Sequence, residues 1–421
     1  MNQERQRIAV IGAGVSGLTT AWLLSEKHDV ELFEAGDYAG GHTNTEIVEA
    51  GGRRWPVNTG FIVFNDWTYP NFIRLMDRLG VPSEVSDMSF SVDSHDNGLQ
   101  YNGTSLNTLF AQRRNLFNPP FLRMIREILR FNQQTRADLA EQRIPDGQTL
   151  GEYLDQHRFS RYFRKYYIVP MGAAIWSAPE LVLERFPVRF FLQFFNNHGM
   201  LSVDDRPTWR VISGGSASYV SRMMERLGQH THLNSPVTTI ERDDDGVTVV
   251  VNGQRQRFDQ VILACHSDQA LAMLATPTVE EQEILGAIGY QDNDVVLHTD
   301  DSVLPSNRRA WAAWNYTIPE TSSQPVSVTY NMNILQNFHE APETFCVTLN
   351  RSRDIDPAKV IKRFRYAHPV FTLDAVSAQG RYHEIGNRNR THFCGAYWFN
   401  GFHEDGVVSA LRVTQAFGVE L

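Results

Sequence analysis

The stretch IAVIGAGVSGLTTAWLL occupies residues 8–24, close to the start of the chain. Its first four residues belong to a short, β-branched, apolar run that predicts a buried parallel strand. Gly12, Gly14 and Gly17 follow in G-x-G-x-x-G spacing, and the residues after them read as a helix. Glycines at these places allow a tight turn, a close approach of the backbone to a pyrophosphate, and close packing of helix on strand. The stretch therefore predicts a dinucleotide-binding unit.

The residues that follow support this prediction. DVELFEA, residues 29–35, reads as a second strand that ends at Glu34, 17 residues past the last glycine of the motif. That is near the distance expected for a carboxylate that binds ribose hydroxyls. The predicted helix starts at Val15 and Ser16, where free N–H groups and a partial positive charge favour phosphate groups.

A second glycine pair separates two kinds of dinucleotide site. EAGDYAGGHTNT, residues 34–45, places Gly40 and Gly41 directly after the acidic residue. This arrangement resembles the flavoprotein superfamily of amine oxidases, phytoene desaturases and protoporphyrinogen oxidases, and it implies FAD rather than NAD. His42 stands where those relatives carry Arg, which weakens the expected phosphate contact. Thr43 keeps the hydroxyl character of the motif.

The resemblance extends over most of the chain. WPVNTGFIVFN (55–65) resembles the segment that passes beside the flavin ring, HLNSPV (232–237) the segment that clamps the adenine, and VILACH (261–266) a further strand and turn. THFCGAYWFNGFHEDGVV (391–408) resembles the last flavin motif, whose helix N-terminus faces the flavin or its pyrophosphate. These motifs add the following cofactor-binding residues: Thr59, Gly60, Phe61, Val237, Ala264, Gly395, Tyr397, Phe402 and His403.

The fold class predicted from these motifs is α/β, with a Rossmann-like FAD-binding domain and an interleaved α+β substrate domain. The FAD-binding domain is expected from residues 1–65, 210–285 and 384–421. The substrate domain is expected from residues 66–209, which read mostly as helices, and 286–383, which read more as strands. Such a two-domain flavoprotein places its substrate where the two domains meet at the flavin.

Two departures from the family pattern concern the way in which the flavin is held. Many relatives carry an acidic residue two positions after the equivalent of Gly395, but Tyr397 stands there, so a hydroxyl or backbone group must take that role. The three cysteines, Cys265, Cys346 and Cys394, are far apart and not where some amine oxidases tether their flavin. We therefore expect non-covalent FAD, no disulfide framework and no metal site.

Composition sets the expected location. The chain has 421 residues, 42% hydrophobic and 21% charged, with a net charge of −9. Its first residues lack an apolar signal core, and no run approaches 18 apolar residues, so neither secretion nor a membrane span is expected. Few cysteines suit a reducing compartment. The expected location is the cytoplasm, and peripheral association with the inner face of the membrane is compatible with it.

The chemistry expected from the sequence is oxidation, desaturation or isomerisation of an apolar substrate, such as a lipid acyl chain, by hydride transfer to the flavin. Amine-oxidising relatives use a Lys near the flavin, and no Lys lies between residues 166 and 358. Phe402 stands where those relatives place an aromatic residue around the amine. The motifs GGHTNT and GFHEDG resemble a bacterial amine-oxidase-like subgroup linked to modified fatty-acid synthesis. An amine or polyamine oxidase and a non-catalytic FAD-binding assembly protein remain as alternatives.

His368 and Phe402 are the two candidate catalytic residues. His368, in RYAHPVF, falls roughly where relatives place residues over the flavin, and a His there could move a proton near neutral pH. The alternative is a structural His that is fixed by hydrogen bonds before a proline. His403, at the start of the last predicted helix, is expected to act through its backbone N–H.

Residues 110–195 differ in charge from the rest of the chain. They hold 13 Lys or Arg against eight Asp or Glu, interleaved with aromatic residues in RFSRYFRKYYIVP and RFPVRFFLQFF. This balance favours an anionic partner, and with a lipid-related flavoprotein we expect a membrane surface rather than nucleic acid. The alternative is that the aromatic side chains form a core and the arginines a solvated face. The sequence leaves the oligomeric state open.

Overall fold

The computed structural model describes residues 5–202, 204–320 and 327–421, and a five-stranded parallel sheet organises one side of the molecule. Its order is β10-β2-β1-β14-β20, and every pairing in it is parallel. Apolar residues fill β1 and β14 because these central strands are covered on both faces. The strands are β1 (Arg7–Ile11), β2 (Asp29–Phe33), β10 (Thr231–His232), β14 (Gln260–Leu263) and β20 (Thr391–Phe393).

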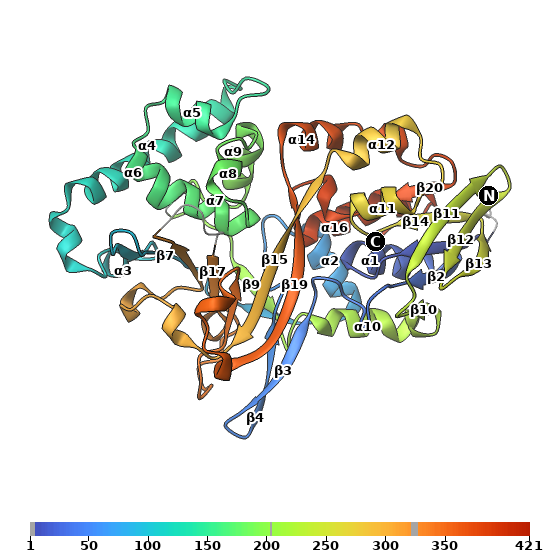
Figure 1. Ribbon diagram of the computed structural model, residues 1–421, viewed down its shortest axis with the longest axis horizontal. Coiled ribbons are helices and arrows are strands. Elements are labelled where there is room, and N and C mark those ends of the chain that lie inside the picture. The colour runs from blue at the N-terminus through green and yellow to red at the C-terminus, as the bar shows by residue number, and fades with distance from the viewer. Residues whose placement is uncertain (1–4, 203, 321–326) are drawn as a thin grey trace.

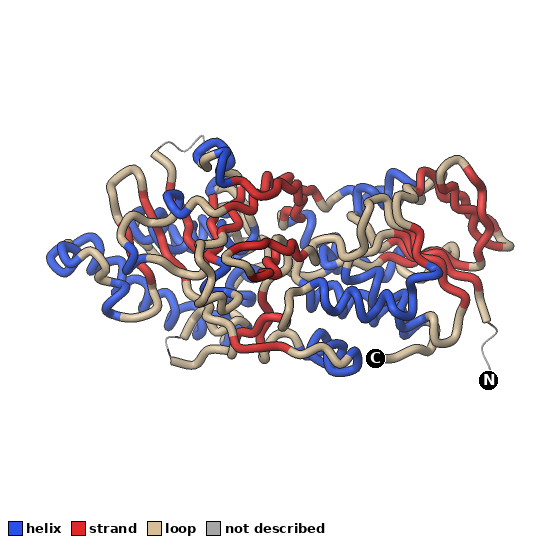
Figure 2. The backbone as a smooth tube through the Cα atoms, turned by 90° about the horizontal axis from the view of Figure 1, so that it is seen from below, coloured by secondary structure: helices blue, strands red, loops and turns tan. Residues whose placement is uncertain are grey.

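Helices and a small antiparallel sheet cover the two faces of the parallel sheet (Figures 1 and 2). One core contains side chains of α1 (Val15–Leu24), α2 (Pro70–Leu79), α10 (Ala217–Leu227) and α16 (His403–Ala416). The other core lies under these elements: α11 (Ser267–Met273), α12 (Val279–Gly286), α14 (Leu373–Gly380), α15 (Tyr382–Ile385), β11 (Val237–Asp243), β12 (Gly246–Val251) and β13 (Gln254–Phe258). The architecture is the predicted α/β one.

A seven-stranded sheet of order β19-β15-β18-β17-β16-β7-β8 forms the second half of the molecule. Its two longest strands pair as an antiparallel ribbon that runs between the two halves (Figure 1). The strands are β7 (Phe90–Ser94), β8 (Gln100–Asn102), β15 (Gly289–His298), β16 (Trp314–Ile318), β17 (Ser327–Asn331), β18 (Cys346–Leu349) and β19 (Val360–Val370), with α13 (Met332–Leu335) between β17 and β18.

Smaller strands join the halves. β3 (Thr45–Ala50) and β4 (Arg53–Asn58) form a hairpin, and β9 (Trp209–Ile212) pairs with both β5 (Val63–Asn65) and β6 (Ser83–Val85). Residues 66–209 are mostly helical, as predicted, but they also contribute β6, β7 and β8. The reason is long-range pairing, since β7 finds its partner β16 more than two hundred residues later in the chain.

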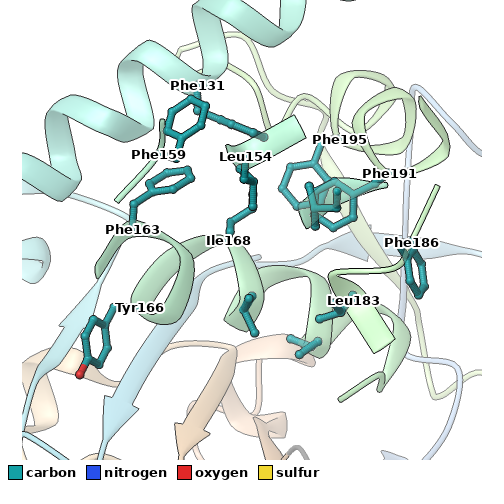
Figure 3. Packing of buried hydrophobic residues seen from close by; sticks show 14 of the residues in the cluster. Phe131, Leu154, Phe159, Phe163, Tyr166, Ile168, Leu183, Phe186, Phe191 and Phe195 are labelled. Atoms are coloured by element: carbon teal, nitrogen blue, oxygen red, sulfur yellow. The ribbon is translucent and has the colours of Figure 1, made fainter. Parts of the chain in front are cut away.

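The helical block packs around a core that is rich in phenylalanine (Figure 3). Its helices are α3 (Leu106–Leu109), α4 (Pro119–Ala140), α5 (Leu150–Gln156), α6 (Arg161–Phe163), α7 (Val169–Trp176), α8 (Glu180–Leu183) and α9 (Val188–Asn197), with a π-helical turn η2 (Arg164–Ile168). Phe163, Phe191 and Phe195 are fully buried in this core. Most aromatic residues around positions 159–195 therefore serve packing, as the alternative of an aromatic core expected, while membrane contact of the block 110–195 stays a prediction.

The strands of the parallel sheet come from all three segments assigned to the FAD-binding domain, while the exact domain boundaries stay a prediction. Within the described ranges, no helix combines the length and apolar character that crossing a membrane requires.

Candidate functional site

The glycine loop between β1 and α1 is shaped to admit a ligand at one position only. A Cβ on Gly12 would lie 2.9 Å from the Ala264 carbonyl oxygen, and one on Gly17 would lie 1.8 Å from the Gly12 oxygen. A Cβ on Gly14 would meet nothing within 4 Å. Gly14 is the N-cap of α1 and has no side-chain capping bond. The start of α1 is therefore open at Gly14, where a phosphate group can reach its N–H groups.

Glu34 lies beside this loop at the end of β2. Its carboxylate accepts the Ala13 N–H and the Gly36 N–H, both at 2.8 Å. Each oxygen keeps lone-pair capacity for a further donor, because an ionised carboxylate accepts about four hydrogen bonds. The predicted adenine segment runs next to it, since the Ser235 N–H donates to the Glu34 carbonyl two residues before Val237. These groups fit the ribose end of a dinucleotide.

The second glycine pair closes against the first loop. Gly40 has a φ of 134°, and a Cβ there would lie 2.4 Å from the Thr43 carbonyl oxygen. Gly41 has a φ of 59°, and its Cβ would lie 3.1 Å from the Gly14 Cα. Only glycine fits both places. The two glycine motifs, separate in the sequence, therefore form one surface.

The start of α16 joins that surface. A Cβ on Gly406 would press on Val15 and Ser16, so α16 and α1 begin side by side. The His403 Nε2 lies 2.8 Å from the Thr43 Oγ1, and its ring stacks on Phe61 at 3.6 Å. The prediction that His403 acts through its backbone alone is incomplete, because its ring fixes α16 to the second glycine loop.

Thr59 and Gly60 lie at the next turn of the same surface. The Thr59 Oγ1 lies 3.1 Å from the Tyr366 hydroxyl oxygen, and a Cβ on Gly60 would lie 2.1 Å from the His42 carbonyl oxygen. The chain after the second glycine pair is thereby held against β19.

His42 and His368 face one another in the interior. Their ring centroids are 5.4 Å apart, and the His42 ring lies 4.9 Å from Tyr366. The His42 Nε2 is buried and has no hydrogen-bond partner among the described residues. Burial, with the nearby histidines adding to it, holds the pKa of His42 well below its usual range. Buried polar groups normally have a hydrogen-bond partner, so the unpartnered ring nitrogen of His42 is available to a polar ligand.

Two polar side chains fix the orientation of His368. Its Nδ1 lies 3.1 Å from the Ser177 Oγ and 3.3 Å from the Asn293 Nδ2. Asn293 presents this nitrogen because its Oδ1 accepts a bond from Asn350 at 2.8 Å. Nδ1 is therefore an acceptor, and the neutral His368 ring carries its proton on Nε2. Burial lowers the pKa of His368 to about 4, which keeps the ring uncharged at neutral pH.

Two of the remaining predicted residues, Gly395 and Ala264, are fixed by contacts within the chain, whereas the Tyr397 hydroxyl has no hydrogen-bond partner among the described residues. Gly395 is anchored by its N–H, which donates to the Ser409 Oγ at 3.0 Å, and Ala264 closes against Gly12. The Tyr397 hydroxyl is buried without a partner in the described chain, so it remains a candidate for the role that the missing acidic residue plays in relatives. Burial raises the pKa of Tyr397 well above its usual range.

Phe402 separates this surface from the helical block. It is the N-cap of α16, its N–H donates to Asp405 at 2.8 Å, and its ring stacks on Phe194 at 5.0 Å. A cavity of about 400 Å³ opens beside it, lined partly by His198 and Asp405. Burial raises the pKa of Asp405 to about 7.

Sequence reasoning missed Ser177, Asn293 and Tyr366. Tyr366 could have been found, because it is two residues from His368 in a segment expected to be rich in strands, and that spacing puts two residues on one face of a strand. Ser177 and Asn293 carry no such signal, since they reach His368 from segments far away in the chain.

Comparison with known proteins agrees with this geometry. The family model for flavin containing amine oxidoreductase matches residues 15–339. Amine oxidase [flavin-containing] A of Canis lupus familiaris is 25% identical over 258 residues, which is 58% of this chain and 46% of that protein. The chain thus spans about half the length of the curated relatives that it matches.

Two solved structures share the fold. Cyclohexylamine oxidase from Brevibacterium oxydans IH-35A has a TM-score of 0.70 at 15% identity and covers 98% of this chain and 100% of its own. The CLA-producing fatty acid isomerase from P. acnes has a TM-score of 0.69 at 16% identity and covers 99% of each chain. The glycine surface, Glu34 and the family match agree, and the chain belongs to the flavin-containing amine oxidoreductases, a family of oxidoreductases, with FAD as its cofactor.

Proposed function

We propose that this chain is an FAD-dependent oxidoreductase that oxidises, desaturates or isomerises an apolar substrate such as a lipid acyl chain. The carrying observation is that the polar side chains facing the expected flavin position are uncharged, with Ser177 and Asn293 buried and His42 and His368 half-buried. His42 and His368 are both held neutral by burial, and Ser177 and Asn293 are neutral side chains. Bound FAD supplies the two-electron acceptor for a substrate C–H bond.

The lysines support this proposal. All four are engaged elsewhere: Lys27 with the Gly418 carbonyl, Lys165 with Asp96, Lys359 with Asp300 and Lys362 with Glu46. None is available to hold a water beside His368. An ammonium substrate would also enter a site whose polar side chains His42, His368, Ser177 and Asn293 carry no negative charge, and burying a cation without a carboxylate partner is costly.

The walls of the region are apolar. α9 carries Phe190, which packs on Phe371 at 4.9 Å, and Phe194, which stacks on Phe402. Phe371 follows His368 closely on the same chain segment. Aromatic side chains therefore pack between β19 and α16. The Nε2–H of His368 is a polar donor in this region that can orient a substrate or stabilise developing negative charge.

Amine oxidation is the second candidate, because cyclohexylamine oxidase and the canine amine oxidase are among the similar proteins. Anaerobic mixing of the FAD-loaded protein with unsaturated phospholipids, free fatty acids, monoamines and polyamines separates the two. We expect flavin bleaching by a lipid and not by the amines. Rapid bleaching by a mono- or polyamine would establish the second candidate instead.

A pair of histidine variants tests the role of the site. His368→Gln replaces the imidazole, which Ser177 and Asn293 orient, with a flexible amide. We expect at least a roughly tenfold slower flavin reduction with an unchanged FAD content, the usual size for one catalytic hydrogen-bonding or proton-transfer group. His230→Gln changes an exposed His outside the site and should leave the rate unchanged. Equal rates in wild type and His368→Gln would remove His368 from the proposal.

A further inference from the structure

The outer end of the helical block carries a surface that the flavin chemistry does not explain. We define the outer tip as α3, the 3₁₀ turn η1 (Arg113–Phe117), the first two turns of α4, and η5 (Arg308–Ala310). α3 lies toward the left end of the molecule in Figure 1, away from the parallel sheet. The Asn307 side chain donates to the Ala111 carbonyl at 3.0 Å and joins η5 to this group.

Large apolar side chains are exposed at the outer tip. Phe117 is 87% exposed, Leu106 is 76% exposed and Leu116 is 46% exposed. The neighbouring Phe121 is fully buried, so the exposed residues are not the edge of a loose core. Leu116 and Phe117 are neighbours in η1, and Arg113 of η1 donates to the carbonyl of Asn107, next to Leu106, so the three belong to one local surface. Exposed apolar side chains that gather on an ordered surface mark a site of association.

Charge distinguishes this surface from the rest of an acidic chain. Residues 99–126 contain four Arg and no Asp or Glu, while the whole chain carries a net charge of −9. With η5, the arginines of the outer tip are Arg113, Arg114, Arg123, Arg126, Arg308 and Arg309.

These arginines are nearly free of carboxylates. Within the described ranges, their only ion-pair contacts are from Arg123 to the buried Glu127 at 3.5 Å and from Arg308 to Asp301 at 3.8 Å. Arg113 donates to the Asn107 and Phe110 carbonyls, which fixes η1 against α3 without neutralising the guanidinium. The positive charge of the tip is therefore preorganised and available to a partner.

A second part of the predicted basic block 110–195, residues 158–165, behaves differently. Arg164 and Lys165 are paired with Asp155 and Asp96, and their aromatic neighbours Phe159 and Phe163 are buried. The phenylalanines of positions 158–165 thus close the core and leave no exposed apolar side chain beside the basic residues, whereas the outer tip combines exposed apolar side chains with unneutralised arginines.

We propose that the outer tip docks the protein on an anionic phospholipid surface. Phe117, Leu116 and Leu106 insert among the acyl chains near the headgroups, and the surrounding arginines bind lipid phosphates. This combination is the one that holds interfacial proteins on membranes, since apolar burial resists salt and charge attraction adds to it. The proposal does not depend on the substrate of the flavin site.

Co-sedimentation of the FAD-loaded protein with vesicles tests it. We expect binding to vesicles that contain phosphatidylglycerol, weaker binding at high salt without complete loss, and little binding to pure phosphatidylcholine. Arg113→Glu with Arg114→Glu should lower the partition coefficient at least about 20-fold, from roughly fivefold per lost cation. Leu116→Ser with Phe117→Ser should lower it roughly tenfold or more and remove the salt-resistant part.

Matched variants carry the same changes elsewhere. Arg54→Glu with Arg185→Glu alters two exposed arginines that have no carboxylate within ion-pair distance in the described chain, and Ile47→Ser with Leu373→Ser alters two exposed apolar residues. Both pairs should bind like wild type, and all variants should keep their flavin.

Three results overturn the proposal. The first is wild-type protein that ignores anionic vesicles at low salt, and the second is equal loss in the matched variants. The third is a protein that ignores vesicles but forms a dimer, or binds single-stranded DNA, through the same residues. Ultracentrifugation and a fluorescent oligonucleotide measure these last two, and either would make the tip a contact for another macromolecule.

Discussion

At the scale of single residues, the three glycines of the first motif have different surroundings. Gly12 and Gly17 are closely packed against backbone atoms, whereas Gly14 faces open space. The first two are needed by the fold itself, because an added methyl group would overlap a carbonyl oxygen. No atom of the described chain crowds Gly14, so packing does not require a glycine there. We attribute the lack of a side chain at Gly14 to the ligand that binds at the start of α1.

This difference makes Gly14→Ala a selective change. We expect the variant to fold with a melting temperature like that of wild type when both are free of FAD, since its methyl group meets no atom within 4 Å. We expect its FAD dissociation constant to rise at least about tenfold, because the methyl group holds the pyrophosphate away from the helix N–H groups. Flavin fluorescence titration measures this.

Gly289→Ala is the matched control, since a methyl group there also meets nothing within 4 Å and Gly289 lies on β15. It should bind FAD as wild type does. A Gly14→Ala protein with unchanged FAD affinity would show that the phosphates pass elsewhere.

How far the sequence predicts single residues depends on where their partners lie. Gly12, Gly17 and Glu34 act within one βα unit, so their spacing alone predicts their environment. The polar setting of His368 depends on Ser177 and Asn293, which the chain brings from other elements. No local sequence pattern predicts these contacts, and none predicts the stacking of His403 on Phe61.

At the scale of elements, α16 does more than the sequence predicts. Its start was predicted from GFHEDG, but its second residue, Glu404, also caps another helix. The Glu404 carboxylate accepts the Asn71 N–H at 3.1 Å and the Phe72 N–H at 2.8 Å, at the start of α2. A carboxylate there satisfies unpaired N–H groups and interacts favourably with the helix dipole.

We therefore expect Glu404→Ala to lower the free energy of unfolding by about 1–3 kcal/mol, because it leaves buried N–H groups of α2 without an acceptor. Urea unfolding followed by circular dichroism measures the change. Glu420→Ala, at an exposed position after the same helix, should have an effect near zero. A loss below about 0.5 kcal/mol in Glu404→Ala would mean that water replaces the carboxylate.

Short strands that pair with distant partners were not predicted from the sequence either. β15 and β19 lie in residues 286–383, which were expected to be rich in strands, whereas the expected helical segment also holds β6, β7 and β8. These three are short and pair with distant partners, and β7 lies beside β16. A strand of three to five residues gains its stability from its neighbours, so its own sequence says little about it.

At the scale of the whole molecule, several histidines are folded in neutral form. Burial lowers the pKa of His198, His298 and His392 to about 4, and all three lie outside the His42–His368 pair. An unfolded chain takes up protons at these rings as the pH falls below about 6.5, whereas the folded chain does not until about pH 4. Their contribution to stability is complete above pH 6.5 and is lost progressively down to pH 4.

We expect the melting temperature to fall steadily as the pH is lowered from 6.5 to 4, measured by differential scanning calorimetry. Asp405, Glu404 and Glu180 work in the opposite direction, because burial raises the pKa of each carboxyl and this favours the folded form as the pH falls, but they are fewer than the buried histidines. His392→Gln should flatten the dependence, while His230→Gln, at an exposed ring, should not. A melting temperature that stays constant over this range would contradict the assignment of neutral buried histidines.

The parallel sheet also decides when the protein can become functional during its synthesis. β1 leaves the ribosome some 250 residues before its neighbour β14, and β20 and α16 follow later still. Pairings between such distant segments form slowly, because a long loop must close first. The cofactor surface of the nascent chain is incomplete until α16 has been translated. We therefore expect FAD to bind after α16 has been translated.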